Sequence, residues 1–93
     1  MLINYTDKGG EHFHEFPERM KHARIGAEKL DVKIDSYHLT MGSFDAVVII
    51  DAPDDETATR LAITNGANGR VRTMTMRVFN EGETIKLTEK LSD

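Results

Sequence analysis

Residues 44–50 constrain the fold more than any other part of this chain. From Ala46 to Ile50 every residue is apolar. Successive side chains of a strand point to opposite faces, so a strand that is apolar at every position is typical of the buried middle of a sheet. The run follows a glycine turn at Gly42-Ser43 and ends before Pro53, which cannot continue a central strand. The sequence therefore predicts a central strand bounded by two turns.

The remaining periodicities predict three more strands and three helices. Residues 2–6 form a short apolar run before a turn at 7–10, and residues 32–41 and 70–79 alternate apolar and polar side chains, so all three are predicted strands. Apolar residues spaced by three and four predict a helix over 17–30 that begins near Pro17. A second helix is expected to start at Asp54 or Asp55 and to end at Gly66 to Gly69, and a third covers 81–91.

This element order predicts an α+β fold of the ferredoxin-like type, βαββαβ with a C-terminal helix. Two βαβ units with right-handed crossovers give one four-stranded antiparallel sheet with the strands in the order 4-1-3-2. The helices cover one face of that sheet, and the other face is too apolar to be left in water. A second copy of the chain is expected to cover it, so we predict a homo-oligomer, a dimer or larger, with a dimeric α/β-barrel.

Composition and charge exclude several classes of function. The formal net charge is −4 and the basic residues are scattered, which argues against nucleic acid as a main partner. No run approaches the roughly 18 apolar residues of a membrane span, and the first residues do not resemble a secretory signal, so a cytoplasmic protein without membrane contact is expected. Cysteine is absent, which leaves neither disulfides nor thiolate metal ligands. No glycine motif typical of phosphate binding follows a strand, and no cofactor is predicted.

Four parts of the chain resemble the GYD domain, a small prokaryotic family of unknown biochemical role among the dimeric α/β-barrel folds. They are residues 4–9, 17–19, 40–45 continuing to 52–58, and 71–79, in the order that the family has. The most specific is the stretch Thr40-Met41-Gly42-Ser43-Phe44-Asp45. Phe44 stands where the family usually has the tyrosine of its name. The resemblance spans nearly the whole chain, and it implies a single GYD-like domain over residues 1–93.

Two residues are candidates for acid–base catalysis, Asp45 and His38. Asp45 enters a strand that otherwise carries no charge, and a carboxylate there could act as a general base. The alternative, which we favour, is that it accepts N–H hydrogen bonds and fixes the hairpin. Histidine is the commonest acid–base residue, but no motif places a nucleophile or carboxylate beside His38, and a half-exposed surface residue is the favoured interpretation.

Five residues are candidates for ligand binding. Tyr5, Thr6, Tyr37 and Thr40 are polar groups near strand ends that could converge beneath the helices. Arg72 lies in the last strand beside methionines, where it could hold an anion if it reached a cavity, or pair with an acidic neighbour at the edge of the sheet.

Two groups of possible metal ligands are better explained without a metal. His12 and His14 are two residues apart, and in a helix their side chains would diverge by about 200°, too far to share an ion. The acidic residues around Asp54 are typical of a helix start before they indicate a magnesium site. No metal site is therefore predicted.

Three functions remain open. The favoured one is a small-molecule-binding or assembly domain that acts as a homo-oligomer, with a small organic ligand in a pocket between sheet and helices. The alternative is a cofactor-free enzyme of the monooxygenase, lyase or isomerase type, by analogy of fold alone, with His38 or Asp45 as base and Arg72 as oxyanion partner. Convergence of these side chains on one enclosed cavity would distinguish the two. A structural module without a ligand would be favoured if the cavity were filled by Phe44, Met74 and Met76.

Overall fold

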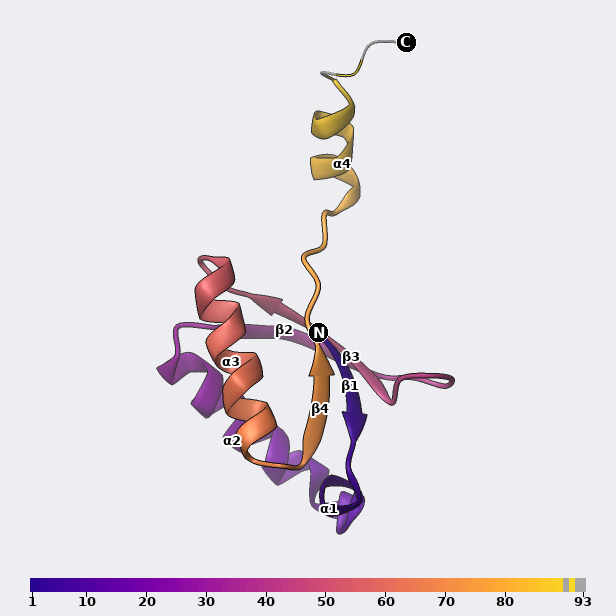
Figure 1. The fold of residues 1–93 in the computed structure, drawn as a ribbon, viewed down its shortest axis with the longest axis vertical. Helices are drawn as coiled ribbons and strands as arrows, with labels where there is room; N and C mark the ends of the chain where they lie inside the picture. The colour runs from indigo at the N-terminus through magenta and orange to yellow at the C-terminus, as the bar shows by residue number, and fades with distance from the viewer. Residues whose placement is uncertain (90, 92–93) are drawn as a thin grey trace.

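A computed structural model describes residues 1–89 and 91. In chain order the elements are β1 (Leu2–Tyr5), α1 (Asp7–Gly10), the 3-10 helix η1 (Phe13–Glu15), α2 (Phe16–Lys29), β2 (Lys33–Leu39), β3 (Ala46–Asp51), α3 (Asp55–Ala67), β4 (Val71–Met74) and α4 (Glu81–Thr88). The strands form one antiparallel sheet in the order β2-β3-β1-β4, with α2 and α3 on one side of it (Figure 1). The predicted ferredoxin-like α+β fold is confirmed, including the strand order. Within the described residues, no helix is long and apolar enough to cross a membrane.

The two long helices start where local chemistry allows. Pro17 lies in the first turn of α2, where its missing N–H costs no hydrogen bond. The carboxylate of Asp54 caps α3 by accepting the N–H of Thr57 at 2.7 Å, and hydrogen bonding from the side chain and then the backbone of Thr57 lowers the pKa of Asp54. The predicted starts of both helices are thus confirmed to within a residue or two.

The pairing register decides which side chains face the helices. Ile3 lies opposite Ala46 on β3 and Thr73 on β4, and Tyr5 lies opposite Val71. Residues paired in this way point to the same side of a sheet, and here it is the side that α2 and α3 cover. The other side, called the open face below, carries Leu2, Asn4, Ser36, His38, Val47, Ile49, Arg72 and Met74.

Strand β2 contains one extra residue, Asp35. Ile34 pairs with Ile50 and Ser36 pairs with Ile49, which leaves Asp35 as a β-bulge. The bulge interrupts the alternation that was predicted for residues 32–41. As a result Ile34 and Tyr37, three residues apart, both face the helices.

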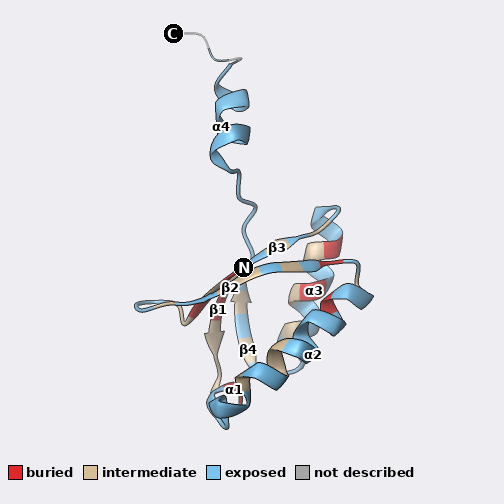
Figure 2. Ribbon diagram, turned by 180° about the vertical axis from the view of Figure 1, so that it is seen from behind, coloured by how far each residue is buried: buried red, intermediate tan, exposed pale blue. Residues whose placement is uncertain are grey.

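The buried core is small. It consists of two clusters, Ile3 with Ala46 and Val48, and Ala27 with Val32 and Leu61. Helix α2 contributes Ala27 as its one buried residue, although it is 14 residues long. Most of the ribbon in Figure 2 is exposed or intermediate, which shows how thinly the helices cover the sheet.

Strand β4 is shorter than the predicted strand over 70–79. Met74 is its last paired residue and lies opposite Leu2, the first residue of β1, so no neighbouring strand of the described chain continues beside residues 75–79. Residues 75–89, called the C-terminal arm below, are exposed throughout and lead away from the sheet to α4 (Figure 1). The predicted third helix is confirmed over Glu81–Thr88, and residue 90 of its predicted range lies outside the described residues.

Candidate functional site

A cavity of about 300 Å³ lies between the sheet and the two long helices. Its floor is the helix-covered face of the sheet, and residues of α2 and α3 form its walls. The floor is largely apolar and includes Ile3, Ile34, Val48 and Ile50. A space of this size and composition is within the range of small-molecule sites.

Small residues on α2 create this space. Ala23, Gly26 and Ala27 line the cavity on consecutive turns of the helix. A Cβ atom added at Gly26 would meet nothing within 4 Å. A larger side chain at this position would therefore enter the cavity or the solvent beside it without a backbone clash.

The most polar point of the cavity floor is a pair of tyrosines. Tyr5 on β1 and Tyr37 on β2 share a hydrogen bond between their hydroxyl oxygens at 2.6 Å. Phe13 packs edge-on against the ring of Tyr5, and Phe16 lies 4.8 Å from the ring of Tyr37. Burial raises the pKa of Tyr5, and the hydrogen bond and the nearby charge of Asp45 raise it further, so its hydroxyl stays protonated at neutral pH.

Arg19 on α2 lines the cavity and connects the segments before α2 to this helix. Arg19 donates to the carbonyl oxygens of Gly9 and Glu11, both at 2.7 Å, and lies 4.0 Å from the carboxylate of Glu15. These contacts hold α1 and η1 against α2. Arg19 was not among the predicted site residues, although it lies in the 17–19 part of the family resemblance and beside the apolar residues of the predicted helix over 17–30.

Of the predicted ligand-binding residues, the structure brings Tyr5 and Tyr37 to the cavity. Thr6 instead caps α1 by accepting the N–H of Gly9, and its hydroxyl donates to the carbonyl of Gly69 at 2.7 Å. The hydroxyl of Thr40 donates to the carbonyl of Phe44 and closes the turn before β3. Both threonines are used by the backbone and do not line the cavity.

Asp45 lies at the start of β3 and binds the backbone of β1. Its carboxylate accepts the N–H of Tyr5 at 2.8 Å, and its own N–H donates to the carbonyl of Ile3 at 2.9 Å. The side chain of Asn4 accepts the same N–H at 3.1 Å. These bonds are those of the structural role that was favoured for Asp45 over a general base.

His38 and Arg72 do not join the tyrosines. Both side chains are exposed on the open face. His38 is on the edge strand β2 and lies opposite Val47, and Arg72 is on the other edge strand, β4, and lies opposite Asn4. The bulge at Asp35 explains the difference for β2, because it turns Tyr37 toward the helices and His38 away from them. The expected convergence of His38, Asp45 and Arg72 on one cavity is therefore not found.

The geometric argument against a shared ion at His12 and His14 is wrong. His12 has a left-handed backbone with φ of 57° and precedes η1, so the two rings do not diverge as in a helix. Their centroids are 5.8 Å apart, and ligand atoms of both residues and of Glu15 lie within 4.8 Å of one another. All three side chains are exposed, and such a cluster is common on surfaces without an ion.

Comparison with known proteins assigns the chain to a family. The model of the GYD domain matches residues 1–88. This chain belongs to the GYD domain family. A relative from Thermus thermophilus, named glutamine synthetase and cystathionine beta-lyase binding protein, is 28% identical over 86 residues, which are 91% of this chain and 90% of the relative. No solved structure matches the chain.

Proposed function

We propose that this GYD domain is a protein-binding assembly module that acts as a homo-oligomer. The observation that supports it best is the open face, an apolar sheet surface with no helix over it. The relative from Thermus thermophilus, which aligns over most of both chains, is named for binding two other proteins. Its name makes protein binding a reasonable expectation for this GYD domain as well.

The open face has the composition of a protein interface. Leu2, Val47, Ile49 and Met74 are its apolar residues, and Met74 is 52% exposed. Polar side chains flank them on both edge strands, Ser36 and His38 on β2 and Arg72 on β4. An apolar centre with a polar rim is typical of surfaces that bind proteins.

The C-terminal arm extends the same surface. In an extended chain, Met76 and Val78 lie on the same side as Met74, and both are more than half exposed. Arg77 points to the other side, where its guanidinium lies 4.8 Å from the centre of the Phe79 ring. The apolar side of the arm is thus continuous with the apolar part of the open face.

Helix α4, at the end of the arm, exposes apolar side chains to solvent. Ile85 and Leu87 are each more than half exposed, and because they are two residues apart in a helix they lie on different sides of it. A capping box between Asn80 and Glu83 stabilises its first turn. A helix of eight residues is nevertheless marginal in water unless its apolar side chains are packed against something.

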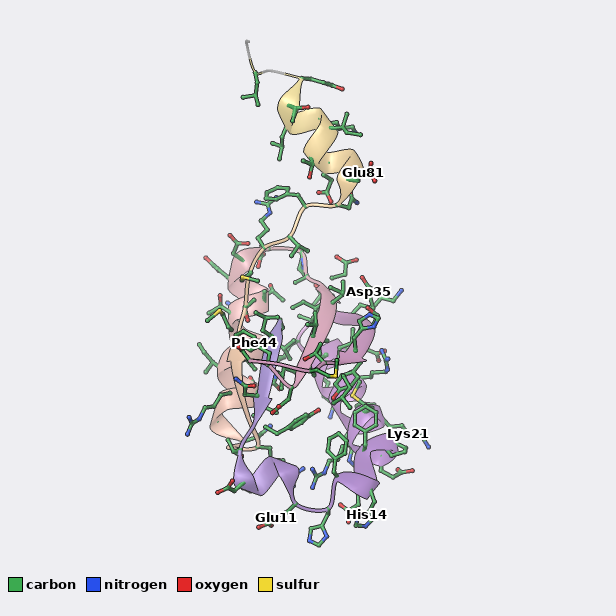
Figure 3. All side chains as sticks on the ribbon, turned by 90° about the vertical axis from the view of Figure 1, so that its right-hand side faces the viewer. Glu11, His14, Lys21, Asp35, Phe44 and Glu81 are labelled. Carbon is green, nitrogen blue, oxygen red and sulfur yellow. The ribbon has the colours of Figure 1, made fainter. Side chains whose placement is uncertain are left out.

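A second copy of the chain can cover the open face and the apolar side of the C-terminal arm at the same time. In a two-fold symmetric dimer the same patch serves on both sides, so each open face covers the other and each arm reaches the neighbouring chain. Because the arm projects beyond its own sheet (Figure 3), it can bury its apolar side only on another molecule or by bending back.

Light scattering after size exclusion tests the assembly. We expect the chain to elute as a dimer or larger at micromolar concentration, and Ile49→Glu, which places a charge on the open face, to shift it to monomer. Ile63→Glu is the matched control, since Ile63 is an exposed apolar residue of α3 and lies away from the open face. A monomeric parent chain, or equal behaviour of the two variants, would contradict the proposal.

Binding to an enzyme is a separate part of the proposal. The relative's name suggests glutamine synthetase as the first partner to try, with the enzyme from the same organism as this chain. Immobilised glutamine synthetase should retain the parent chain and Ile63→Glu. If the column retains neither chain while the oligomer stays intact, the self-assembly part of the proposal stands and glutamine synthetase is not a partner.

The cofactor-free enzyme is the less supported alternative. It requires His38 or Asp45 as base and Arg72 as oxyanion partner around one cavity. Asp45 is occupied by backbone hydrogen bonds, and the other two side chains are on the open face. No specific observation favours this reaction class over assembly.

A further inference from the structure

We infer that the cavity beneath α2 and α3 binds a small, uncharged, largely apolar molecule that carries one hydroxyl or carbonyl group. This site is on the opposite side of the sheet from the open face. The inference is therefore independent of the proposed assembly, and each can fail without the other.

The shape of the cavity argues for a ligand. Helix α2 presents small residues, Ala23, Gly26 and Ala27, to a sheet floor of isoleucine and valine side chains. Close packing is the rule in protein interiors, and a site of about 300 Å³ left open by small side chains is an exception to it. An apolar molecule in this space would bury the floor that the helix leaves uncovered.

The tyrosine pair fixes one polar group of that molecule. Two hydroxyls carry two hydrogens, and their shared bond uses one, which leaves the second hydrogen to donate elsewhere. Among the described residues no other partner is found for either hydroxyl. An oxygen atom of the ligand, from a hydroxyl or a carbonyl, can accept this remaining hydrogen, and the rings of Phe13 and Phe16 provide an aromatic wall beside it.

The charged groups that line the cavity are all cationic, so they disfavour a cationic ligand. Each of them is engaged by protein oxygen atoms or exposed to water, and the Met1 ammonium donates to the carbonyl of Val48 at 2.8 Å. The guanidinium of Arg19 is engaged by the carbonyls of Gly9 and Glu11 and lies near the carboxylate of Glu15. His22 and Arg70 also line the cavity but are exposed, so water screens them. No carboxylate lines the cavity among the described residues, which removes the natural partner of a cationic ligand.

The test compares two probes that differ by one hydroxyl, 2-naphthol and naphthalene. Each is titrated into the ¹⁵N-labelled chain, and the amide shifts of residues 23–27 and 37 report on the cavity. We expect 2-naphthol to bind about two- to tenfold more tightly, the range for one hydrogen bond. Tyr37→Phe removes one hydroxyl of the pair, and it should bring the two affinities within a factor of about two while naphthalene still binds.

A cavity-filling variant locates the probe. Gly26→Leu adds a large side chain at a residue that lines the cavity and favours the helix, so the chain should stay folded and bind both probes more weakly. Ile25→Leu, on the exposed side of the same helix, is the control and should bind as the parent does. Circular dichroism and light scattering verify the fold and the oligomer of each variant.

Three results would overturn the inference. The first is that neither probe shifts these amides up to its solubility limit. The second is that Gly26→Leu, shown to be folded, binds both probes as tightly as the parent does. The third is that the parent binds naphthalene as tightly as 2-naphthol, which would remove the role of the tyrosine pair. None of these results bears on whether Ile49→Glu is monomeric, so the assembly is judged separately.

Discussion

Tyr5 is held by hydrogen bonds at its backbone and at its side chain. The carboxylate of Asp45 accepts its backbone N–H, and the hydroxyl of Tyr37 binds its side chain. The first bond joins β1 to the start of β3, and the second joins β1 to β2 across the floor of the cavity. One residue thus links three strands of the sheet, and its neighbours offer separate tests of the two contacts.

The backbone contact predicts an asymmetry between two substitutions of Asp45. Asp45→Ala leaves the half-buried N–H of Tyr5 without an acceptor, and we expect the free energy of unfolding to fall by about 1–3 kcal/mol. Asp45→Asn keeps an amide oxygen at the same place and should cost clearly less. Urea unfolding measures both variants. An equal loss of stability in the two would show that this hydrogen bond is not how Asp45 stabilises the fold.

The side-chain contact predicts a dependence of stability on alkaline pH. The folded state raises the pKa of Tyr5 above its ordinary value of 10.0, because burial and the bond to Tyr37 disfavour the phenolate. A group of this kind contributes its full stability below the ordinary pKa and loses that contribution as the pH rises above it. We therefore expect stability to be insensitive to Tyr5 up to about pH 10 and to fall beyond it.

The chain is well suited to measuring this effect, because it has two tyrosines and no tryptophan. Phenolate absorbance and circular dichroism can be followed in one titration. Tyr5 is expected to ionise together with unfolding, and Tyr37→Phe should move that transition to lower pH. Ionisation of Tyr5 well before any loss of circular dichroism would contradict the assignment.

At the scale of elements, the sequence predicted the helices and strands whose limits depend on residues close together in the chain. The apolar run before Pro53 became β3, and the capping residue Asp54 and the early Pro17 set the starts of α3 and α2. Each of these signals acts within a few residues of the element that it bounds. For this reason the order of elements, and with it the fold, could be read from the sequence.

Features that depend on distant residues could not be read in this way. β4 ends at Met74 because its pairing partner β1 begins at Leu2. The alternation of apolar and polar side chains in residues 70–79 carries no information about where β1 begins. The bulge at Asp35 arises from the pairing of β2 with β3, and it decides that Tyr37 rather than His38 reaches the cavity. The candidate residues Tyr5 and Tyr37 were predicted, but their contact and the separation of Arg72 from them were not.

The junction between α1 and β4 gives a prediction about two adjacent glycines. A Cβ atom at Gly9 would lie 1.8 Å from the carbonyl oxygen of Arg70, a backbone atom that cannot move aside cheaply, whereas one at Gly10 would meet nothing within 4 Å. We expect Gly9→Ala to lower the free energy of unfolding by about 1–3 kcal/mol or more, as overpacking does. Gly10→Ala should change it by less than about 1 kcal/mol. Thermal or urea unfolding measures both variants. If Gly9→Ala leaves the stability unchanged, the backbones of Gly9 and Arg70 are farther apart in solution.

At the scale of the whole molecule, the arm should contribute to self-association. Val78→Asp puts a charge on its apolar side, and we expect the dissociation constant of the oligomer to rise at least about tenfold. Lys86→Ala, at an exposed charged residue of α4, is the control and should have little effect. Analytical ultracentrifugation measures both. Equal dissociation constants would show that the arm lies outside the interface, even if the open faces still meet.

The position of β1 in the middle of the sheet sets when this domain can fold during synthesis. β1 comprises residues 2–5, but one of its two neighbours is β4, made of residues 71–74, so the sheet closes only after residues 71–74 have left the ribosome. Pairing across so long a loop is also slow, because contacts between distant residues are formed late. The arm follows β4 and is therefore synthesised after it. A nascent chain can therefore present its arm to another molecule only after its own sheet is able to close, which orders folding before assembly.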